Sequence, residues 1–390
     1  MIAFRLAYRN LAGAGLRTWL NAAVLSISFV VIVWHKGLLE GWNRQARRDT
    51  IDWEIGGGQY WHASYDPYDP FTLADSHGPL PAALRAQQAA GGLAPILIGQ
   101  ATIYPEGRMR SVLLKGIDPA QRVLRLPSAE LAVDTEEIPI LLGTRMARAN
   151  HLRVGDVVAA RWRDAGGTFD AADARVVGIF KTNVPTVDDG TVWVPLSRLR
   201  AMLRMPGEST LLVAAPAAAP VAATEGWRWQ GHAELLGDFD RMMRQKSVGG
   251  FVLYGLLLFL ALLALFDTQV LSVFRRQREI GTHIALGMTR GQVIRLFTLE
   301  GTLHAVLGVL LAFVWGGPLL WLQATQGFDF PAATDDYGFA VADTVFPAYT
   351  LGWVLTTVVL VLLATTIVSF MPARRIARMR PTDAIRGKIQ

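Results

Sequence analysis

The stretch FVLYGLLLFLALLALFDTQVLSVF, residues 251–274, contains a single charged side chain, that of Asp267. A helix of about 20 apolar residues is long enough to cross the roughly 30 Å hydrocarbon core of a bilayer. Three other stretches have the same character, at residues 19–39, 302–322 and 345–370. The sequence therefore predicts four transmembrane helices, in agreement with a hydrophobic content of 52% and a mean hydropathy of +0.29.

The first apolar stretch differs from a cleaved signal peptide. It is long, about 18 residues precede it, and no small-x-small pattern follows it.

The chain has no cysteine, which excludes disulfides and thiolate metal sites.

The distribution of Lys and Arg predicts the orientation of the chain, because cytoplasmic loops are enriched in these residues. Cations dominate before span one, between spans two and three, and after span four, whereas the loop between spans three and four is acidic. Both termini and the second loop are therefore predicted to be cytoplasmic. The net charge of +6 reflects this asymmetry and contact with anionic lipid, and it does not indicate nucleic-acid binding.

The predicted fold class is a membrane α+β protein, with four transmembrane helices and a large mixed α/β extracytoplasmic (periplasmic) domain inserted between helices 1 and 2. Residues 1–18 are predicted to form an N-terminal interfacial helix, although a simple basic flank fits equally well. The other predicted segments are span one (19–41), the extracytoplasmic domain (42–246), span two (247–274), a cytoplasmic coupling-helix loop (275–300), span three (301–323), a short extracytoplasmic loop (324–344), span four (345–371) and a basic cytoplasmic tail (372–390).

Within the large domain, short runs rich in Val and Ile alternate with helical patterns. Strands are predicted at residues 110–116, 156–162, 175–181 and 191–195, and helices at residues 80–90, 143–151, 196–205 and 233–246. This alternation indicates an α+β domain.

The loop between spans two and three, FRRQREIGTHIALGMTRGQVIRLFTLEG (residues 274–301), has apolar residues at helical spacing. Gly287 and Gly291 are expected to bracket a turn, with Thr289 capping a second helix. A short amphipathic helix below the membrane could insert into a partner's cleft and transmit a rigid-body movement. An ordinary basic interfacial hairpin is the alternative.

The run R-x-R-E-I-G-x-x-x-A-L-G-M-x-x-x-x-V-I, from Arg276 to Ile294, resembles the hallmark of FtsX-like (type VII) ABC transporter permeases. Macrolide exporters and lipoprotein-releasing systems share this family. The tail from Pro372 to Pro381 is similar to the family's ending. Outer-domain motifs at residues 99–100, 114–119, 142–143, 154–157 and 178–180 resemble the lipoprotein-releasing branch.

The resemblance implies a permease subunit that couples hydrolysis by a separate ATPase to extraction or export of a lipoprotein or similar amphiphile from the outer leaflet of the bacterial inner membrane. The residues implied to couple to the ATPase are Arg276, Arg278, Glu279, Ile280, Gly281, Ala285, Leu286, Gly287 and Met288. Glu279 would contact the ATPase directly, although local pairing with Arg275 or Arg276 is an alternative.

The implied partners are two copies of the ATPase, a second permease that is identical or related, the lipid bilayer, a lipoprotein substrate and a periplasmic carrier. The resemblance also leaves two other functions open. One is a signal transmitter that regulates an extracytoplasmic hydrolase, and the other is an exporter or sensor of antibiotic peptides.

The chain is not expected to be an enzyme, because no G-x-x-x-x-G-K-[ST] loop for phosphate binding is present. ATP and Mg are therefore expected to bind the partner ATPase, and no cofactor is expected here. No metal site is expected either. His62 and His77 lie near several Asp residues but lack the spacing of zinc motifs.

Asp267 is predicted to be an intramembrane polar residue. Since a carboxylate in lipid is costly, it should face the bundle interior, a partner subunit or the cytoplasmic interface.

Overall fold

The computed structural model describes residues 7, 9, 13, 15–218, 220, 225–276, 282, 284, 287–329 and 344–377. These residues divide into two compact units. The folded unit lies largely within Arg44–Met242, and the helical unit lies within Met1–Asn43, Met243–Phe330 and Asp343–Gln390. Each unit is described below by itself.

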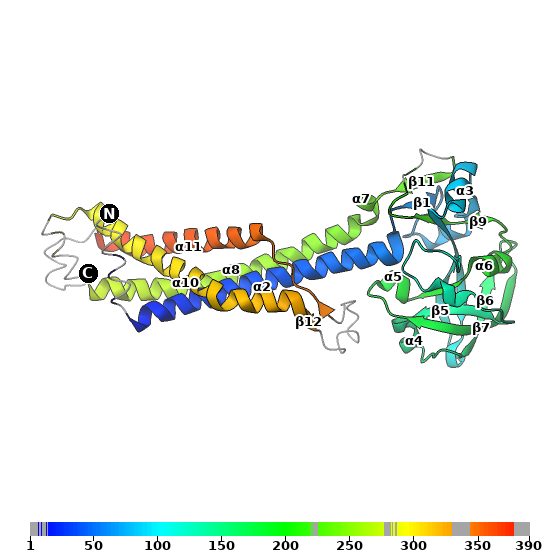
Figure 1. Cartoon of the computed structure of the whole chain (residues 1–390), viewed down its shortest axis with the longest axis horizontal. Coiled ribbons are helices and arrows are strands. Elements are labelled where there is room, and N and C mark those ends of the chain that lie inside the picture. The colour runs from blue at the N-terminus through cyan, green and yellow to red at the C-terminus, as the bar shows by residue number, and fades with distance from the viewer. Residues whose placement is uncertain are drawn as a thin grey trace. The chain divides into compact units, whose positions relative to one another are not determined.

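Four long helices are apolar enough to cross a membrane, as predicted. They are α2 (Leu16–Thr50), α8 (Gly237–Arg275), α10 (Arg290–Gln326) and α11 (Leu351–Ala377) (Figure 1). With 27 to 39 residues each, they are about 40–60 Å long and exceed the thickness of a hydrocarbon core. Helices α2, α8 and α10 extend into polar residues at both ends of their apolar stretches, whereas α11 begins only at Leu351, because residues 344–345, where span four was predicted to start, form β13.

Small residues on α10 allow its neighbours to approach closely. A Cβ atom on Gly308 would lie 2.9 Å from Leu25 Cβ and 3.2 Å from the carbonyl oxygen of Ala22, both on α2. A Cβ atom on Gly301 would overlap the side chain of Ser369 on α11. Transmembrane helices associate mainly through such close packing, because lipid is as apolar as the helices themselves.

Hydrogen bonds between helices add to this packing. Trp315 Nε1 donates to Ser26 Oγ at 2.6 Å, which joins α10 to α2. The hydroxyls of Thr302 and Thr366 are 3.0 Å apart and join α10 to α11. Each bond gives a polar side chain a hydrogen-bond partner, which the hydrocarbon of a bilayer does not offer.

The folded unit is built around a nine-stranded sheet with the order β11-β1-β10-β3-β4-β8-β5-β7-β6. The strands of the unit are β1 (Gln59–His62), β2 (Gly78–Pro79), β3 (Leu93–Ile103), β4 (Arg110–Ile117), β5 (Ile138–Gly143), β6 (Val157–Arg163), β7 (Phe169–Phe180), β8 (Thr191–Pro195), β9 (Glu208–Ser209), β10 (Leu211–Ala214) and β11 (Trp227–Gln230). Its helices are α3 (Ala82–Ala89), α4 (Thr144–Ala149), α5 (Pro185–Asp188), α6 (Leu196–Leu203) and α7 (His232–Leu235). A further short pair, β12 (Phe328–Asp329) and β13 (Thr344–Val345), belongs to the helical unit.

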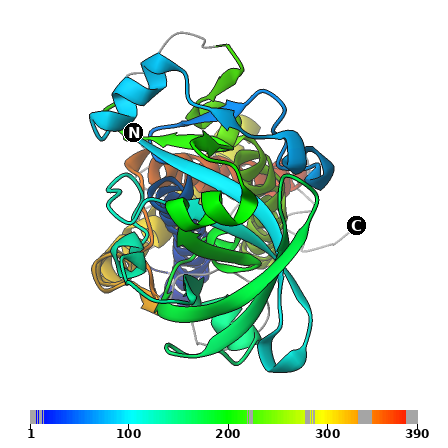
Figure 2. The same cartoon turned by 90° about the vertical axis from the view of Figure 1, so that its right-hand side faces the viewer.

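An additional pairing between β3 and β6 closes part of this sheet into a barrel of β3, β4, β8, β5, β7 and β6. Figure 2 shows strands of this sheet curving around a common interior. The 11-residue β3 makes closure possible: its residues 93–96 pair with β10, residues 97–103 with β4, and residues 101–103 with β6. Closure removes exposed strand edges from this part of the sheet.

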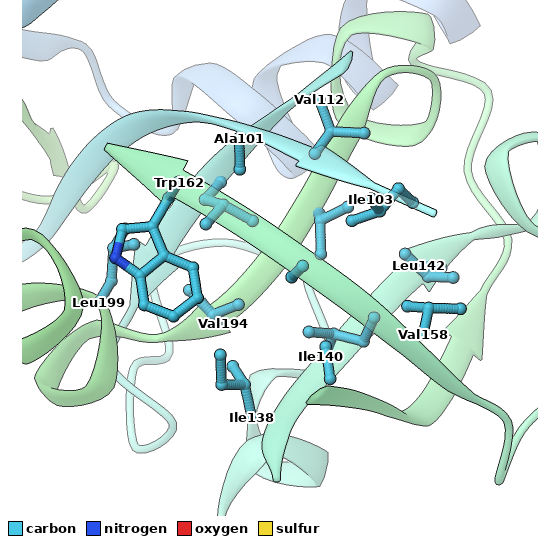
Figure 3. Close-up of a cluster of buried hydrophobic side chains, with 14 of the residues drawn as sticks. Ala101, Ile103, Val112, Ile138, Ile140, Leu142, Val158, Trp162, Val194 and Leu199 are labelled. Atoms are coloured by element: carbon cyan, nitrogen blue, oxygen red, sulfur yellow. The ribbon is translucent and has the colours of Figure 1, made fainter. Parts of the chain in front are cut away.

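The barrel interior is a cluster of buried hydrophobic side chains, and Figure 3 shows Ile140, Val158, Trp162 and Val194 among them. Trp162 Nε1 donates to the carbonyl oxygen of Met202 at 2.9 Å, so its polar atom is satisfied although the side chain is buried. The outer face of the same strands is also covered, since Leu141 and Trp193 belong to a second cluster outside the barrel. Strands β5 and β8 are consequently buried at every residue.

All four predicted strands in this unit are confirmed, as β4, β6, β7 and β8. The predicted helices at 80–90, 143–151 and 196–205 are also confirmed, as α3, α4 and α6. The helix predicted at 233–246 is wrong in one respect, because it divides into α7 and the start of α8 at Leu236. Strands β1, β3, β5, β10 and β11 were not predicted.

The packing predicts different effects for two Gly→Ala substitutions on α10. Gly301→Ala places a methyl group against Ser369 and should lower the free energy of unfolding by about 1–3 kcal/mol, the usual cost of overpacking. Gly317→Ala is the control, because nothing lies within 4 Å of its Cβ position, and it should leave stability unchanged or slightly higher. Unfolding in mixed detergent micelles measures both values, and equal stability of the two variants would contradict the packing.

Candidate coupling site

The predicted coupling residues fall in the segment between α8 and α10. Of these, Arg276, Gly287 and Met288 belong to the described residues. The other predicted coupling residues lie outside the described residues, namely Arg278, Glu279, Ile280, Gly281, Ala285 and Leu286.

Arg276 directly follows α8 and contacts α10. Its Nη1 lies 2.9 Å from Glu300 Oε1 and 3.3 Å from Glu300 Oε2. Its guanidinium also lies 5.3 Å from the ring centroid of Phe297. The side chain of Glu300 is only 8% exposed, so this carboxylate is removed from water, and Arg276 is a cation that compensates its charge.

Sequence reasoning missed this pair, because it assigned Arg276 to the coupling residues and considered Glu279, not Glu300, as its local partner. The sequence does contain a signal for this pair. Glu300 is an acid at the edge of an apolar helical run, and several Arg residues lie in the same segment between spans two and three. The observed contact gives Arg276 a structural role at the end of the bundle. Its predicted contact with an ATPase stays a prediction.

The start of α10 is fixed by a turn and a capping box. Gly287 has φ +99°, a backbone conformation that favours glycine, and its N–H donates to the carbonyl oxygen of Ile284 at 3.0 Å. Thr289 Oγ1 accepts from the N–H of Gln292 at 3.3 Å, and Gln292 Oε1 accepts from the N–H of Thr289 at 2.9 Å. The predicted cap at Thr289 is confirmed, whereas Gly291 lies inside the first turn of α10 and does not bound the turn.

Met288 and Ile284 are partly buried against a small apolar cluster formed by Val293, Phe297 and Ala373. This cluster contains residues of α10 and α11 together with the loop residues. The loop is therefore attached to two helices of the helical unit by apolar contact as well as by the ion pair.

Asp267 lies on an exposed face of α8, between the buried residues Leu265 and Gln269. Within the part of the chain that the structure describes, no hydrogen bond or ion pair reaches its carboxylate, whereas the adjacent Thr268 hydroxyl donates to Asn21 Oδ1 at 3.2 Å. Its side chain is therefore exposed on the described part of this bundle, and its predicted environment stays a prediction.

The histidines near the Asp-rich loop of the folded unit have structural contacts. His77 Nδ1 contacts the carboxylate of Glu208, and the ring of His62 packs edge-on against Trp227. Burial, followed by the charge of His77, lowers the pKa of His62. Among the described residues, no group of three or more His, Cys, Asp or Glu side chains is placed to hold a metal ion.

Residues 251–381 match the FtsX-like permease C-terminal family. The lipoprotein-releasing system transmembrane protein LolC of Xylella fastidiosa is 25% identical over 76% of this chain and 77% of the relative. LolC of Neisseria meningitidis serogroup B is 26% identical over 58% and 60%, respectively. The macrolide export ATP-binding/permease protein MacB of Rhodopirellula baltica is 29% identical over 36% of this chain but only 18% of its own length.

A search of solved structures gives the extracellular domain of the ABC-type transporter YknZ from Gram-positive bacteria. It shares 13% sequence identity, and its TM-score is 0.27 over 42% of this chain and 84% of the neighbour.

The Arg276–Glu300 pair predicts a measurable coupling energy. Arg276→Gln removes the cation that pairs with the Glu300 carboxylate and should lower the free energy of unfolding by about 1–3 kcal/mol. The double variant Arg276→Gln/Glu300→Gln should be less destabilised than the sum of the two single variants by about 1 kcal/mol or more. Arg295→Gln, at an exposed position of α10, is the control and should have little effect. If the destabilisation of the double variant equals the sum of the two single variants, the contact contributes no net free energy to folding.

Proposed function

We propose that this chain, which carries an FtsX-like permease domain and is similar to the LolC and MacB permeases, is the membrane subunit of an ABC transporter that extracts or exports a lipoprotein or similar amphiphile. In this proposal a separate ATPase supplies the energy. The observation that carries it is the attachment of the loop before α10, since the Arg276–Glu300 pair, the Thr289 cap and the Met288 cluster join it to α8, α10 and α11. A push on such a loop would move the helices rather than deform the loop.

The coupling contact itself is proposed from the resemblance. Glu279, with Arg278 beside it, would meet the ATPase, while Ile280, Gly281, Ala285 and Leu286 would complete the coupling helix. Gly287 would then end that helix, which agrees with its positive φ and with its hydrogen bond to Ile284. ATP and Mg would bind only to the ATPase, and this chain would take no part in hydrolysis.

The assembly that we propose has two ATPase subunits and two permeases, identical or related. Both termini and the loop before α10 would face the cytoplasm of a bacterium, and the folded unit would lie outside the inner membrane. The charge distribution along the chain supports this orientation, because the loop between α10 and α11 contains acids but neither Lys nor Arg. The surface that Asp267 exposes on α8 is one place where a second permease could contact this chain.

The deciding experiment is reconstitution of the full chain with a candidate ATPase in proteoliposomes that contain a lipid-modified protein. The proposal expects ATP-dependent release of that protein to a soluble acceptor. ATP-dependent activation of an added extracytoplasmic hydrolase without any release would overturn it in favour of signal transmission. ATP-dependent release of a peptide antibiotic but not of the lipoprotein would favour peptide export instead.

The turn before α10 predicts a substitution that separates ATP hydrolysis from transport. Gly287→Ala forces a Cβ atom into a left-handed backbone conformation, which costs about 1–2 kcal/mol and favours a different loop geometry. Lipoprotein release should fall several-fold while ATPase activity and membrane insertion persist. Gly291→Ala, in the first turn of α10 with nothing within 4 Å of its Cβ position, is the control and should leave both activities unchanged. Equal release by the two variants would count against coupling through this loop.

A further inference from the structure

The folded unit contains a cavity of about 520 Å³ on the outer face of its barrel. Its floor is formed by Ile98 of β3, Lys115 of β4 and Trp193 of β8, which are paired in register across the three strands. We call it the Lys115 cavity. Its volume falls within the range of roughly 300–1,000 Å³ that is usual for small-molecule sites.

The walls of the Lys115 cavity are largely apolar and aromatic. Residues that line it include Ile55, Trp61, Tyr65 and Leu211. Ile55 ends a π-helical turn, Ile51–Ile55, directly after α2. Short π-helical turns of this kind are frequent at functional sites. The rings of Trp61 and Tyr65 are 5.2 Å apart in an edge-to-face arrangement, which gives one wall a rigid aromatic surface.

Charged residues also line the cavity, and most of them are already paired. Tyr68 donates a hydrogen bond to Asp238, and Arg241 forms an ion pair with the same carboxylate. Glu54 accepts a hydrogen bond from Thr186 Oγ1 at 2.6 Å. Glu234 is the remaining carboxylate among the lining residues.

Lys115 differs from these residues. Within the part of the chain that the structure describes, no hydrogen bond or ion pair reaches its Nζ atom, which lies 5.4 Å from the ring centroid of Trp193. Burial lowers the pKa of Lys115, and the charge of Glu54 opposes this effect only in part. A desolvated ammonium group is costly unless an anion pairs with it. Lys115 is therefore a partly buried cation on the cavity floor without an ion-pair partner among the described residues, and Glu54 is a carboxylate in the same lining.

Tyr65 supplies a second polar group without a described partner for its hydroxyl. Burial, followed by the charges of Glu54 and Asp66, raises the pKa of Tyr65 to about 12. The hydroxyl is consequently protonated at neutral pH and is available as a hydrogen-bond donor. A cation and a neutral donor on apolar walls are a suitable set for a carboxylate or phosphate that carries a hydrocarbon body.

We propose that the Lys115 cavity binds a small anionic amphiphile, with Lys115 as the counter-ion of its head group, Tyr65 as a hydrogen-bond donor and the aromatic walls around its apolar body. This site is separate from the coupling loop, and the proposal holds whatever cargo the permease moves. Two sources share the required chemistry, a free fatty acid and a single-chain lipid with a phosphate head group.

The test is equilibrium dialysis of radiolabelled decanoate, and separately of a single-chain lysophosphatidic acid, against the full chain in lipid nanodiscs, with binding to empty nanodiscs subtracted. We expect saturable binding of one molecule per chain. Lys115→Met should weaken it about 10- to 100-fold and Tyr65→Phe about 3- to 10-fold, as expected for loss of a charged and a neutral hydrogen bond. Lys181→Met, which removes an exposed lysine outside the cavity, is the matched control and should bind like the unmodified chain.

The dependence on pH distinguishes charge pairing from loss of fold. Decanoate binding should weaken as the pH rises through the pKa of Lys115, since the lysine then loses its charge, whereas Lys115→Arg should bind decanoate up to higher pH. Binding of decanoate alone would identify a free acid as the ligand, and binding of the lysolipid alone would identify a phosphate head group; either result supports the site. Absence of saturable binding of both probes, or equal binding by Lys115→Met and Lys181→Met, would overturn it.

Discussion

The helical unit depends on how closely α10 can approach its neighbours. In lipid there is little hydrophobic gain from helix association, so contact must come from close packing and from polar groups that find partners within the bundle. Gly301 and Gly308 remove the side chains that would hold α11 and α2 away from α10. Ser26, bonded to Trp315, and Thr302, paired with Thr366, then supply hydrogen bonds along the same contacts. The position of α10 in turn determines where Glu300 lies and hence which residue can neutralise it.

The segment before α10 is attached to the helices on both of its sides. Arg276 is the first residue after α8, and its partner Glu300 lies within α10, so this ion pair links the end of α8 to α10. The apolar contacts of Met288 extend the attachment to Ala373 of α11. The ion pair and these apolar contacts therefore attach the segment to α8, α10 and α11.

Hydropathy was sufficient to predict the four long helices, because a bilayer requires long apolar segments whose backbone bonds are satisfied internally. It did not predict where those helices end, since Arg290 to Glu300 are polar enough to resemble a loop but continue α10 without a break. Strands such as β6 were predictable because exposed and buried residues alternate along them. Strand β5 was missed although β8, which is equally buried at every residue, was predicted: the TVWVP run of β8 is rich in β-branched and aromatic residues, whereas the IPILLG run of β5 contains a proline and two leucines. The Arg276–Glu300 pair was missed because Glu300 was assigned to the loop, whereas it lies within α10, whose packing brings it to Arg276.

The pairing of β3 also constrains the order in which the chain can reach its final form. This strand needs β4, β6 and β10 as partners, and the last of these ends at Ala214, more than a hundred residues downstream. Contacts between distant segments form slowly, because a long loop must be closed before they contribute free energy. The nine-stranded sheet, unlike the barrel within it, cannot be completed until β10 has been synthesised. Until then β3 presents unpaired backbone groups, and the nascent chain has to be kept from pairing with other strands.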